Sequence, residues 1–302
     1  MTILMAGEKA SERFLDFFVA TIRNANTRRA YWIATRDFFH WIEDHRLKLE
    51  EIKPIHVSVY IEQHPGSPPT VKQHLAALKR LFDWLVTGHV IETNPASPVK
   101  GPRHVVKKGK THVLSSEDTR LLLDSIDTSH VVGLRDRAII GTMVFSFARV
   151  GAVSQLRVRD YYQNGKRWWF RFQEKGGKHH EVPAHHLAEQ YVDEYLHEAE
   201  IEDDSDGPLF RPSNGKTRRL FRKRLSQKQI LKMVKRRCEE AGLPETICSH
   251  SFRATGITTF ILNGGTLERA QKIACHESPR TTKLYDRTDD SITLDEIERI
   301  MI

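Results

Sequence analysis

The second half of the chain holds polar side chains whose types and surroundings suit phosphoryl-transfer chemistry. Arg149 lies near the end of an apolar segment, residues 139–151. A guanidinium there must find an anion, either a ligand or a structural salt-bridge partner, because burying it unpaired is expensive. His250 and Arg253 stand three residues apart near a predicted helix start, with Ser249 as the predicted N-cap. This spacing places an imidazole and a guanidinium on one face beside a helix N-terminus, where phosphate binds readily. A lone His-x-x-Arg pattern is nevertheless weak support.

A tyrosine near the end of the chain could supply a nucleophile for such chemistry. Tyr285 comes nine residues after His276, which follows Cys275 at a predicted helix end. Displacement at a phosphodiester needs a nucleophile, cations for the phosphate oxygens and a proton for the leaving oxygen. Because the unperturbed pKa of tyrosine is about 10, its hydroxyl needs a base or a cationic environment to attack at neutral pH. Arginines offer forked donors to the phosphate oxygens.

The β segment predicted in the second half is a hairpin that carries a lysine. The alternating aromatic residues 167–173 favour a strand, residues 174–177 a turn and residues 178–183 the returning strand. Lys175 then stands at the tip of this hairpin. The rest of this half is predicted to be mostly helical, with a capped start at 114–118 and helices at about 183–199, 226–241, 249–263, 266–274, 279–285 and 294–301.

The first hundred residues show helical periodicity and no strand pattern. Phe14, Phe17 and Phe18 share one helix face, Thr27 is predicted to cap a second helix, a third covers 55–63, and a fourth starts at Thr70 after a Pro-rich breaker. We therefore predict a mainly α protein with two domains. An all-α N-terminal domain spans 1–99, and a basic linker spans 100–112. A predominantly helical domain with a small antiparallel β-sheet spans 113–302 and ends in a tail helix at 291–302.

Charge is distributed unevenly along the 302 residues, whose 47 Lys and Arg against 39 Asp and Glu give a net charge of +8. Residues 193–206 hold eight acidic residues and no Lys or Arg, whereas residues 211–237 hold twelve Lys or Arg and no acidic residue. Cations without a compensating anion repel one another, and phosphate would relieve that repulsion. A plain solvated surface is the alternative explanation for this run and for the basic linker. The charge thus indicates a polyanionic partner.

Composition excludes several other classes of protein. Hydrophobic residues at 39% and charged residues at 28% argue against wholesale disorder. The longest apolar stretch, around 138–148, is too short to span a bilayer, and the first residues lack a signal-peptide pattern. The three cysteines, Cys238, Cys248 and Cys275, lack zinc-site spacing, and there is no Walker A motif. We expect a soluble cytoplasmic protein with reduced thiols and no metal.

Four motifs together resemble those of the tyrosine recombinase, or phage-type integrase, family. They are Phe-Ala-Arg-Val-Gly at 147–151, Glu-Lys-Gly-Gly-Lys at 174–178, His-Ser-Phe-Arg at 250–253, and Cys-His-Glu-Ser at 275–278 leading to Tyr285. They occur in the order of that family and at similar distances. The preceding helical domain and linker also fit, so the resemblance covers nearly the whole chain. It implies the DNA breaking-rejoining fold, with a core-binding N-terminal domain and a catalytic domain.

The resemblance also implies an activity. The chain would be a site-specific recombinase that cleaves and rejoins duplex DNA through a covalent 3′-phosphotyrosyl intermediate, without metal, ATP or another cofactor. Tyr285 would be the nucleophile, and Arg149 and Arg253 would hold the scissile phosphate. His250 would accept or donate a proton. The resemblance does not specify the DNA site, or whether the chain serves a mobile genetic element or the resolution of replicon dimers.

Two further roles and two departures complete the resemblance. Lys175 would be the general acid, and His276 a further hydrogen-bond donor to the phosphate. The family commonly has an acidic residue three positions after the first arginine, where this chain has Ala152, so Arg149 must be supported from elsewhere. The family usually has glycine before the second histidine, where this chain has Cys275. A metal or thiol site at Cys275 is the less favoured alternative.

The implied partner is double-stranded DNA, around which the two domains would close as a clamp. Four protomers would assemble with two DNA sites as a synaptic tetramer in a prokaryotic cytoplasm, at the nucleoid when bound. The cations expected to contact the DNA backbone are Lys72, Lys79, Arg80, Arg103, Lys107, Lys108, Arg218, Arg219 and Arg222.

Two questions stay open at this point. The tail stripe of Leu294, Ile297 and Met301 could pack on its own domain or be donated to a neighbouring protomer, as the family resemblance suggests. The chain could also be an accessory DNA-binding protein of the same fold that cleaves no strand, or a topoisomerase that relaxes DNA by the same chemistry. Retention of all six polar positions argues against the accessory protein, whereas Ala152 leaves that alternative open.

Overall fold

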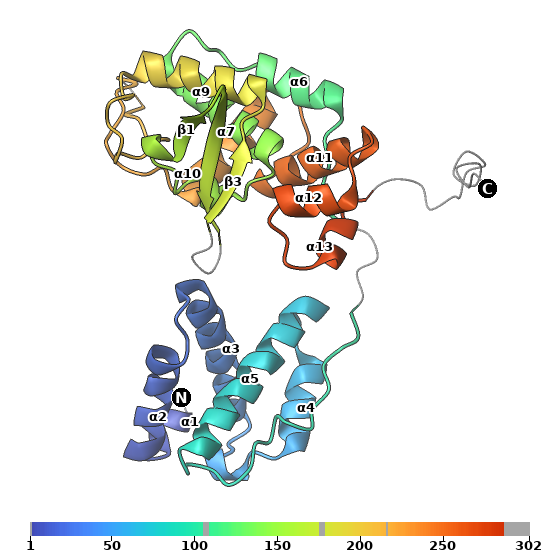
Figure 1. Cartoon of the computed structure of the whole chain (residues 1–302). Helices are drawn as coiled ribbons and strands as arrows, with labels where there is room; N and C mark the ends of the chain where they lie inside the picture. The colour runs from blue at the N-terminus through green and yellow to red at the C-terminus, as the bar shows by residue number, and fades with distance from the viewer. Residues whose placement is uncertain (1, 105–108, 175–178, 216, 287–302) are drawn as a thin grey trace, which may run out of the picture. The chain divides into compact units, whose positions relative to one another are not determined.

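The computed structural model describes residues 2–104, 109–174, 179–215 and 217–286, drawn in colour in Figure 1. The chain divides into two compact units, 1–105 and 106–302. Each unit contains its own cluster of buried apolar side chains. The predicted tail helix at 291–302 lies outside the described residues. No helix in the described part of the chain is long and apolar enough to cross a membrane.

The N-terminal unit is helical throughout its described regular structure, as the sequence predicted. Its elements are α1 (Thr2–Met5), α2 (Glu8–Ala20), α3 (Ala25–Asp44), the short 3₁₀ helix η1 (Leu49–Glu51), α4 (Pro54–Gln63) and α5 (Pro68–Thr87).

Two helix starts in this unit differ from the prediction. Helix α3 begins at Ala25, before Thr27, because the Asn24 side chain is the actual cap and accepts a hydrogen bond from the backbone N–H of Thr27 at 3.1 Å. Helix α5 begins at Pro68, before Thr70. Proline suits the first turn of a helix, where the N–H that it lacks would have no intrahelical partner.

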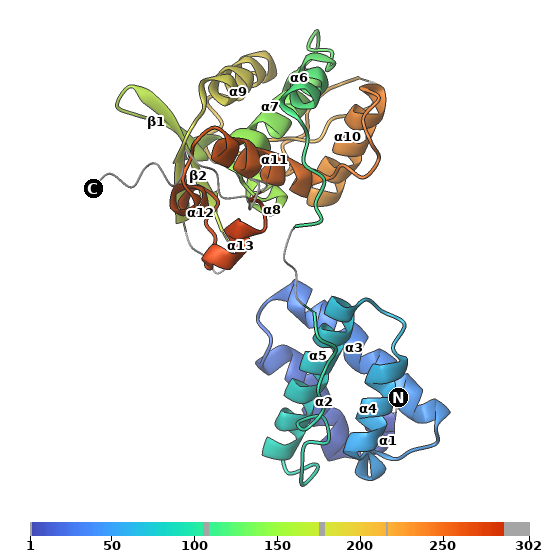
Figure 2. The same cartoon turned by 90° about the vertical axis from the view of Figure 1, so that its right-hand side faces the viewer.

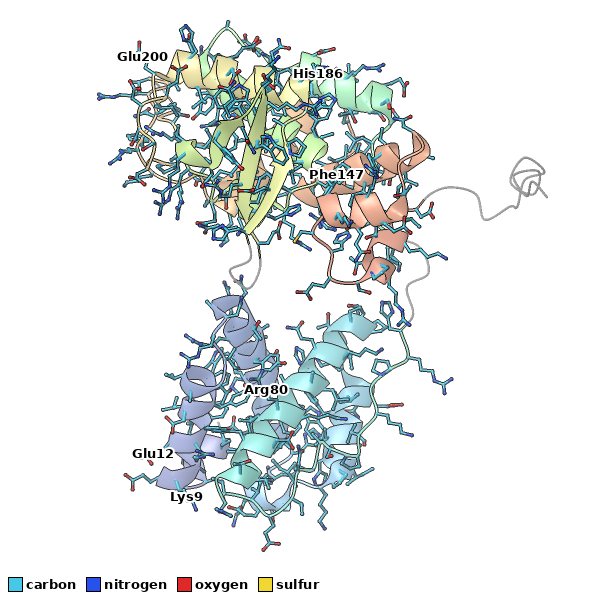
Figure 3. The ribbon with its side chains drawn as sticks, in the orientation of Figure 1. Lys9, Glu12, Arg80, Phe147, His186 and Glu200 are labelled. Atoms are coloured by element: carbon cyan, nitrogen blue, oxygen red, sulfur yellow. The ribbon has the colours of Figure 1, made fainter. Side chains whose placement is uncertain are left out.

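Buried phenylalanines hold the N-terminal helices together. Phe38 of α3 and Phe82 of α5 meet edge to face with ring centroids 5.9 Å apart, and Phe14 of α2 meets Phe39 of α3 at the same distance. Such aromatic pairs contribute about 0.5–1.5 kcal/mol beyond the burial of their area. The apolar stripe of α5 faces this core. The exposed positions of the same helix include Arg80, which is labelled in Figure 3.

The second unit is mainly helical around a small sheet, as predicted. Its elements are α6 (Ser116–Asp124), α7 (Val131–Ser146), α8 (Val150–Val153), the 3₁₀ helix η2 (Val158–Asp160), β1 (Tyr161–Asn164), β2 (Arg167–Gln173), β3 (His179–Pro183), α9 (His186–Ala199), α10 (Gln227–Glu240), α11 (Ser249–Leu262), α12 (Leu267–Ile273) and α13 (Pro279–Lys283). Figure 2 shows α11, α12 and α13 gathered on one side of this unit.

The sheet has the strand order β1-β2-β3, and both pairs are antiparallel. The hairpin of β2 and β3 was predicted, with Gln173 pairing His179 at its outer end. Strand β1 was not predicted, because four residues are too few for a periodic pattern. It pairs with β2 so that Tyr161 opposes Phe170, and both side chains are buried in the core of the unit.

Helix α7 forms the centre of the second unit. Its residues are buried almost all round, including Ile139, Ile140 and Met143 at 0% exposure. A helix that is buried on nearly every side has no amphipathic signal, so the sequence showed only an apolar segment here. Helices α9 and α11 both pack against α7. Arg149 comes three residues after the end of this buried helix.

The basic run 211–237 is not free of compensating anions. Asp204, from the acidic run, binds Arg211 at 2.5 Å and Arg222 at 2.6 Å. Asp136 of α7, whose side chain is fully buried, binds Arg237 at 2.9 Å. The prediction of uncompensated cations was therefore wrong for these arginines, since acids distant in sequence fold against them. The same pairing holds the Asp204 pKa well below its ordinary value, chiefly through Arg222.

Candidate active site

Helix α11 carries two of the predicted residues on its first turns. His250 and Arg253 lie one turn apart beside the N-terminus of α11. The helix begins at Ser249, so the prediction that Ser249 caps it was wrong. Cys248 is the N-cap, with extended backbone, and its N–H donates to the Ser251 hydroxyl at 3.2 Å. The one-turn spacing predicted from the sequence is confirmed.

Arg253 is almost fully buried, with 1% of the residue exposed. One of its terminal nitrogens donates to the Phe147 carbonyl oxygen, and the other donates to the Ala274 carbonyl oxygen at 2.5 Å. Its Nε has no protein partner in the described residues. The guanidinium is therefore fixed between the end of α7 and the end of α12 by its two terminal nitrogens, and its Nε meets no acceptor among the described residues.

Phe147 links α7 to the site through an unusual backbone conformation. It ends α7 at a φ of 55°, in the left-handed region that bulky residues rarely adopt. This turn aims the Phe147 carbonyl at Arg253. The ring, labelled in Figure 3, packs against Phe260 of α11 with centroids 6.0 Å apart and shares a small apolar cluster with Tyr285. The strained conformation of Phe147 is thus stabilised by the contact of its carbonyl with Arg253 and by the packing of its ring.

Tyr285 follows α13 and is 7% exposed. Its carbonyl oxygen accepts a hydrogen bond from the Thr258 hydroxyl of α11 at 2.9 Å. Its hydroxyl lies 2.8 Å from His250 Nε2. A phenol and an imidazole from elements far apart in sequence are therefore in hydrogen-bonding contact within one chain.

Burial and nearby charges shift the pKa values of Tyr285 and His250 in opposite directions. Burial raises the Tyr285 pKa above 10, and the nearby Arg253 and Arg149 oppose that rise only in part. Although His250 as a whole residue is exposed, its Nε2 faces the buried phenol. Desolvation, followed by the charges of Arg253 and Arg149, lowers the His250 pKa below 6.5. At neutral pH the phenol is protonated and the imidazole is neutral, and in the Nδ1–H tautomer of His250 the hydroxyl donates to Nε2.

His276 lies against the ring of Tyr285. Its ring is stacked on Tyr285 at a centroid distance of 5.7 Å, and its Nδ1 is 2.9 Å from the Thr282 hydroxyl. Burial, with Arg253 as the next cause, lowers the His276 pKa to about 3, so the ring is neutral. The preceding Cys275 has a φ of 49°. That left-handed position after α12 favours glycine, which explains the residue type expected there.

Arg149 stands between α7 and α8 and forms one ion pair. Its Nη1 donates to Glu174 Oε2 at 2.5 Å. The Glu174 side chain is 6% exposed, whereas that of Arg149 is 42% exposed. Ala152, in the place where an acid was expected, is buried in the core of the unit. The anion that Arg149 required is thus a structural salt-bridge partner, supplied by the residue that follows β2.

Lys175 lies outside the described residues, so its predicted position at the hairpin tip stays a prediction. The two strands of the hairpin are described, and β3 is tied to α12 near the outer end of the hairpin. His180 Nε2 of β3 lies 2.8 Å from the carbonyl oxygen of Ile273, the last residue of α12. The hairpin that ends beside Glu174 is therefore fixed to the helix that precedes His276.

The cations predicted to contact the DNA backbone differ in their exposure and in their protein partners. Lys107 and Lys108 lie outside the described residues, and Lys79 is half-buried. The exposed members are Lys72, Arg80, Arg103, Arg218, Arg219 and Arg222. Two of these already have protein partners, since Arg80 donates to the Thr21 carbonyl oxygen at 2.9 Å and Arg222 grips Asp204 with two nitrogens at 2.6 and 2.7 Å.

Metal-binding clusters are absent from the part of the chain that the structure describes, where no group of three His, Cys, Asp or Glu could hold an ion. A cavity of about 330 Å³ adjoins His250 and is lined in part by Lys110, His112 and Cys248. The site groups are thus arginines, histidines and a phenol, which suit displacement at a phosphodiester.

Family comparison decides among chemistries that such a set could serve. Residues 112–291 match the profile of the phage integrase family, and residues 12–89 match the N-terminal SAM-like domain of phage integrases. The first match alone covers more than half of the chain.

The chain belongs to the phage integrase family.

Relatives that this chain resembles include tyrosine recombinases. The chain is 25% identical over 287 residues to tyrosine recombinase XerD of Listeria monocytogenes, covering 91% of this chain and 92% of the relative. It is 26% identical over 219 residues to tyrosine recombinase XerC of Chlamydia caviae, covering 72% of this chain and 66% of the relative. The chain is a tyrosine-type site-specific recombinase that cleaves and rejoins DNA.

Solved integrase-family structures share the fold. The post-cleavage complex of XerH recombinase with a palindromic difH substrate has a TM-score of 0.70 at 22% identity and covers 90% of this chain and 78% of that one. A lambda integrase dimer bound to a COC′ core site has a TM-score of 0.71 at 15% identity and covers 94% and 80%. The predicted two-domain, mainly helical fold with a small antiparallel sheet is confirmed.

Sequence reasoning on this integrase missed the residues that hold the site together. Thr258 and Thr282 bind Tyr285 and His276, and Glu174 binds Arg149. The threonines gave no signal, because hydroxyl residues are common on helices. Glu174 did give one, since an acid stands directly beside Lys175 in a chain that lacks the expected acid at position 152.

Proposed function

We propose that Tyr285 attacks the scissile phosphate of duplex DNA and forms a 3′-phosphotyrosyl bond that conserves the energy of the phosphodiester for rejoining. The contact between the Tyr285 hydroxyl and His250 Nε2, at 2.8 Å, carries this proposal. It gives the nucleophile a neutral proton acceptor in the ground state. No metal ion and no ATP enter the reaction.

The cleavage step balances with this chain's own residues. The bond from Tyr285 Oη to phosphorus forms as the bond from phosphorus to the 5′ oxygen breaks. The phenolic proton passes to His250, and the leaving oxygen takes a proton, which we assign to Lys175. Arg149, Arg253 and His276 hold the phosphate oxygens, each such donor being worth about 3 kcal/mol of the barrier. Rejoining reverses the step with a second 5′ hydroxyl as nucleophile.

The buried position of Arg253 supports its assignment to the phosphate. Two backbone carbonyls hold its terminal nitrogens, and Nε has no protein partner among the described residues. A buried donor without an acceptor costs about 1–3 kcal/mol, which an incoming phosphate oxygen would recover. Desolvation and the charge of Arg149 lower the Arg253 pKa to about 10, so the side chain stays cationic at neutral pH.

Strand exchange needs two DNA sites and therefore more than one protomer. A solved relative is a lambda integrase tetramer bound to a Holliday junction. By analogy, we infer that this chain forms a synaptic tetramer on DNA in the bacterial cytoplasm, with the two domains of each protomer around the duplex. The apolar stripe of Leu294, Ile297 and Met301 would join neighbouring protomers.

Covalent capture on randomised duplexes tests this function and identifies the DNA site in one experiment. The protein is incubated with a library of duplexes that carry a randomised 40-bp segment and staggered nicks, so that the cleaved strand end dissociates. We expect a denaturant-resistant protein–DNA adduct, whose sequencing identifies the preferred half-site. The adduct should be lost in Tyr285→Phe, because phenylalanine has no hydroxyl to form the bond.

Tyr162→Phe is the matched control, because it removes a tyrosine hydroxyl on β1, outside the site. It should retain adduct formation. An adduct that survives in Tyr285→Phe would refute the nucleophile assignment. Binding of the library without any adduct from the wild-type protein would instead support an accessory DNA-binding role.

A further inference from the structure

Glu174 and Arg149 form an asymmetric ion pair at the edge of the site. The carboxylate is buried, with 6% of its side chain exposed, and it lies 2.5 Å from Arg149 Nη1. A buried carboxylate is costly unless it is paired, and the guanidinium supplies that pairing. The arginine is 42% exposed on its side, so the pair does not remove its guanidinium from solvent.

We propose that Glu174 is the positioning residue of Arg149 and takes the place of the carboxylate that Ala152 does not provide. This inference rests on the assignment of Arg149 to the scissile phosphate. It adds a residue that touches neither the DNA nor the nucleophile and acts through the guanidinium.

The geometry of the contact indicates that Glu174 positions the Arg149 guanidinium and does not block its access to phosphate. In the described residues Glu174 engages Arg149 through Nη1 alone. A guanidinium has five N–H donors arranged as a fork, so the Nε and Nη2 edge stays available for a phosphate oxygen. A carboxylate that mimicked the phosphate would be expected to occupy both prongs of the fork. Glu174 therefore orients the arginine and leaves its binding edge open.

Placement in the fold makes Glu174 a rigid support. It follows Gln173, which pairs with His179 across the hairpin. The next residue of β3, His180, contacts the Ile273 carbonyl oxygen at 2.8 Å. Arg149 is thus held by a carboxylate whose strand is fixed to α12. An acid at position 152 would have held it from the short helix α8 instead, where Ala152 is 5% exposed and part of the core.

The charge of Glu174 also reaches the second arginine. After desolvation, the charge of Arg149 is the next cause that lowers the Arg253 pKa. Glu174 acts in the opposite direction and raises it. One buried carboxylate therefore helps two guanidinium groups to remain together before phosphate arrives. Without it, their repulsion would drive the more exposed Arg149 away from the site.

The test is a single-turnover cleavage assay on the nicked half-site duplex recovered by covalent capture. Glu174→Gln keeps the size of the side chain and removes its charge. We expect its rate of adduct formation to fall about 10- to 100-fold, because a displaced catalytic group loses rate of this order. Half-site binding and the thermal unfolding temperature should stay near those of the wild type.

Glu181→Gln is the matched control, because Glu181 of β3 also binds an arginine, Arg171 at 2.8 Å, on the same sheet and outside the site. Its cleavage rate should equal that of the wild type. An unchanged rate in Glu174→Gln would overturn the proposal. A faster rate would also overturn it, because it would show that Glu174 blocks the site.

A modified substrate separates action through Arg149 from action through the neighbouring Lys175. When sulfur replaces the scissile 5′ oxygen, the leaving group is a thiol with a pKa of about 8.5, which departs without a proton donor. The loss caused by Glu174→Gln should persist on this substrate. If the loss of cleavage rate disappears on this substrate, Glu174 acts through the proton donation by Lys175, and the proposal is overturned. A loss of rate that is matched by weaker half-site binding or by a lower thermal unfolding temperature would also overturn it. Absence of any adduct from the wild type would instead reject the proposed function.

Discussion

Burial holds His250 and Tyr285 in the protonation states that suit the proposed cleavage reaction. The buried phenol keeps its proton because its pKa is raised, and the imidazole stays neutral because its pKa is lowered. Desolvation is the main cause of both pKa shifts. The cations Arg253 and Arg149 limit the rise in the Tyr285 pKa and add to the lowering of the His250 pKa. Both groups are therefore neutral at neutral pH, and in the proposed reaction the proton moves to His250 as Tyr285 attacks.

The pH dependence of cleavage should show this arrangement. The His250 pKa lies below 6.5, so the basic form predominates above that pH and is lost as the pH falls below its pKa. We expect the second-order rate constant of adduct formation, measured with DNA well below saturation, to be level near neutral pH. It should fall on an acidic limb with a midpoint below 6.5. This rate constant reports the free enzyme.

His250→Gln should remove the acidic limb and slow cleavage by about 10²- to 10⁴-fold, because glutamine cannot accept the proton. His112→Gln is a suitable control, since His112 lines the adjoining cavity and has no part in the proposed proton transfer. An acidic limb that persists unchanged in His250→Gln would show that another group accepts the proton.

Helices α7 and α11 approach closely, and this contact positions both arginines. At Gly256 of α11 an added Cβ would lie 2.1 Å from the Val144 carbonyl oxygen of α7 and 2.6 Å from the Phe147 ring. Glycine is therefore required by the distance between the two helices. The same contact places Arg253 beside the Phe147 carbonyl, two residues before Arg149.

Gly256→Ala should separate the two helices. Alanine normally stabilises a helix by about 1 kcal/mol relative to glycine, but here the Cβ meets a backbone atom that must shift. We expect the free energy of unfolding of the second unit to fall by about 1–3 kcal/mol, together with slower adduct formation below the unfolding temperature. Thermal or denaturant unfolding measures the first effect, and the half-site assay measures the second.

Gly151→Ala is the helical control, because its added Cβ would meet only the flexible Gln227 side chain, at 3.2 Å. Its unfolding free energy should be less affected. Equal losses in the two variants would mean that the close approach of α7 and α11 does not limit stability.

At the scale of the whole chain, the segment that follows the division at 105 contacts the residue before Tyr285. The Gly109 N–H donates to the carbonyl oxygen of Leu284, the residue before Tyr285, at 2.9 Å. A Cβ at Gly109 would lie 2.6 Å from that oxygen. The start of the catalytic unit therefore runs along the segment that bears the tyrosine.

Deletion of the residues after Asp289 tests the proposed role of the tail in assembly. The remaining chain keeps Tyr285 and the whole described catalytic site. We expect the truncated protein to bind a single half-site with little loss, while complexes with two or more protomers on a full site become much weaker. Native gel electrophoresis on half-site and full-site duplexes distinguishes these species. Equal loss on both duplexes would reject the role in assembly.

A matched variant, Leu294→Ser combined with Ile297→Ser, keeps the length of the chain and removes apolar groups from the stripe. It should reproduce the assembly defect. If it assembles normally while the truncated chain does not, the apolar stripe is not the contact.

The sequence by itself determined the helical pattern, the β2–β3 hairpin and the order of the reactive residues. Periodicity revealed amphipathic helices such as α5 and α10, and alternation revealed β2 at its observed limits. These signals are local, so they survive in a single chain read without its fold. They failed at α7, which is buried on all sides, and at β1, which is too short to alternate.

Only the tertiary structure decided which charges meet. Asp136 binds Arg237 across 101 positions, and Asp204 neutralises Arg222 across 18, so the basic run is partly paired within the protein. Glu174 reaches Arg149 across 25 positions, and this contact replaces an interaction expected only three positions away. Ion pairs depend on distance in space and on desolvation, and sequence separation encodes neither. The polar residues of the candidate site could therefore be proposed from the sequence, whereas the residues that hold them and shift their pKa values required the fold.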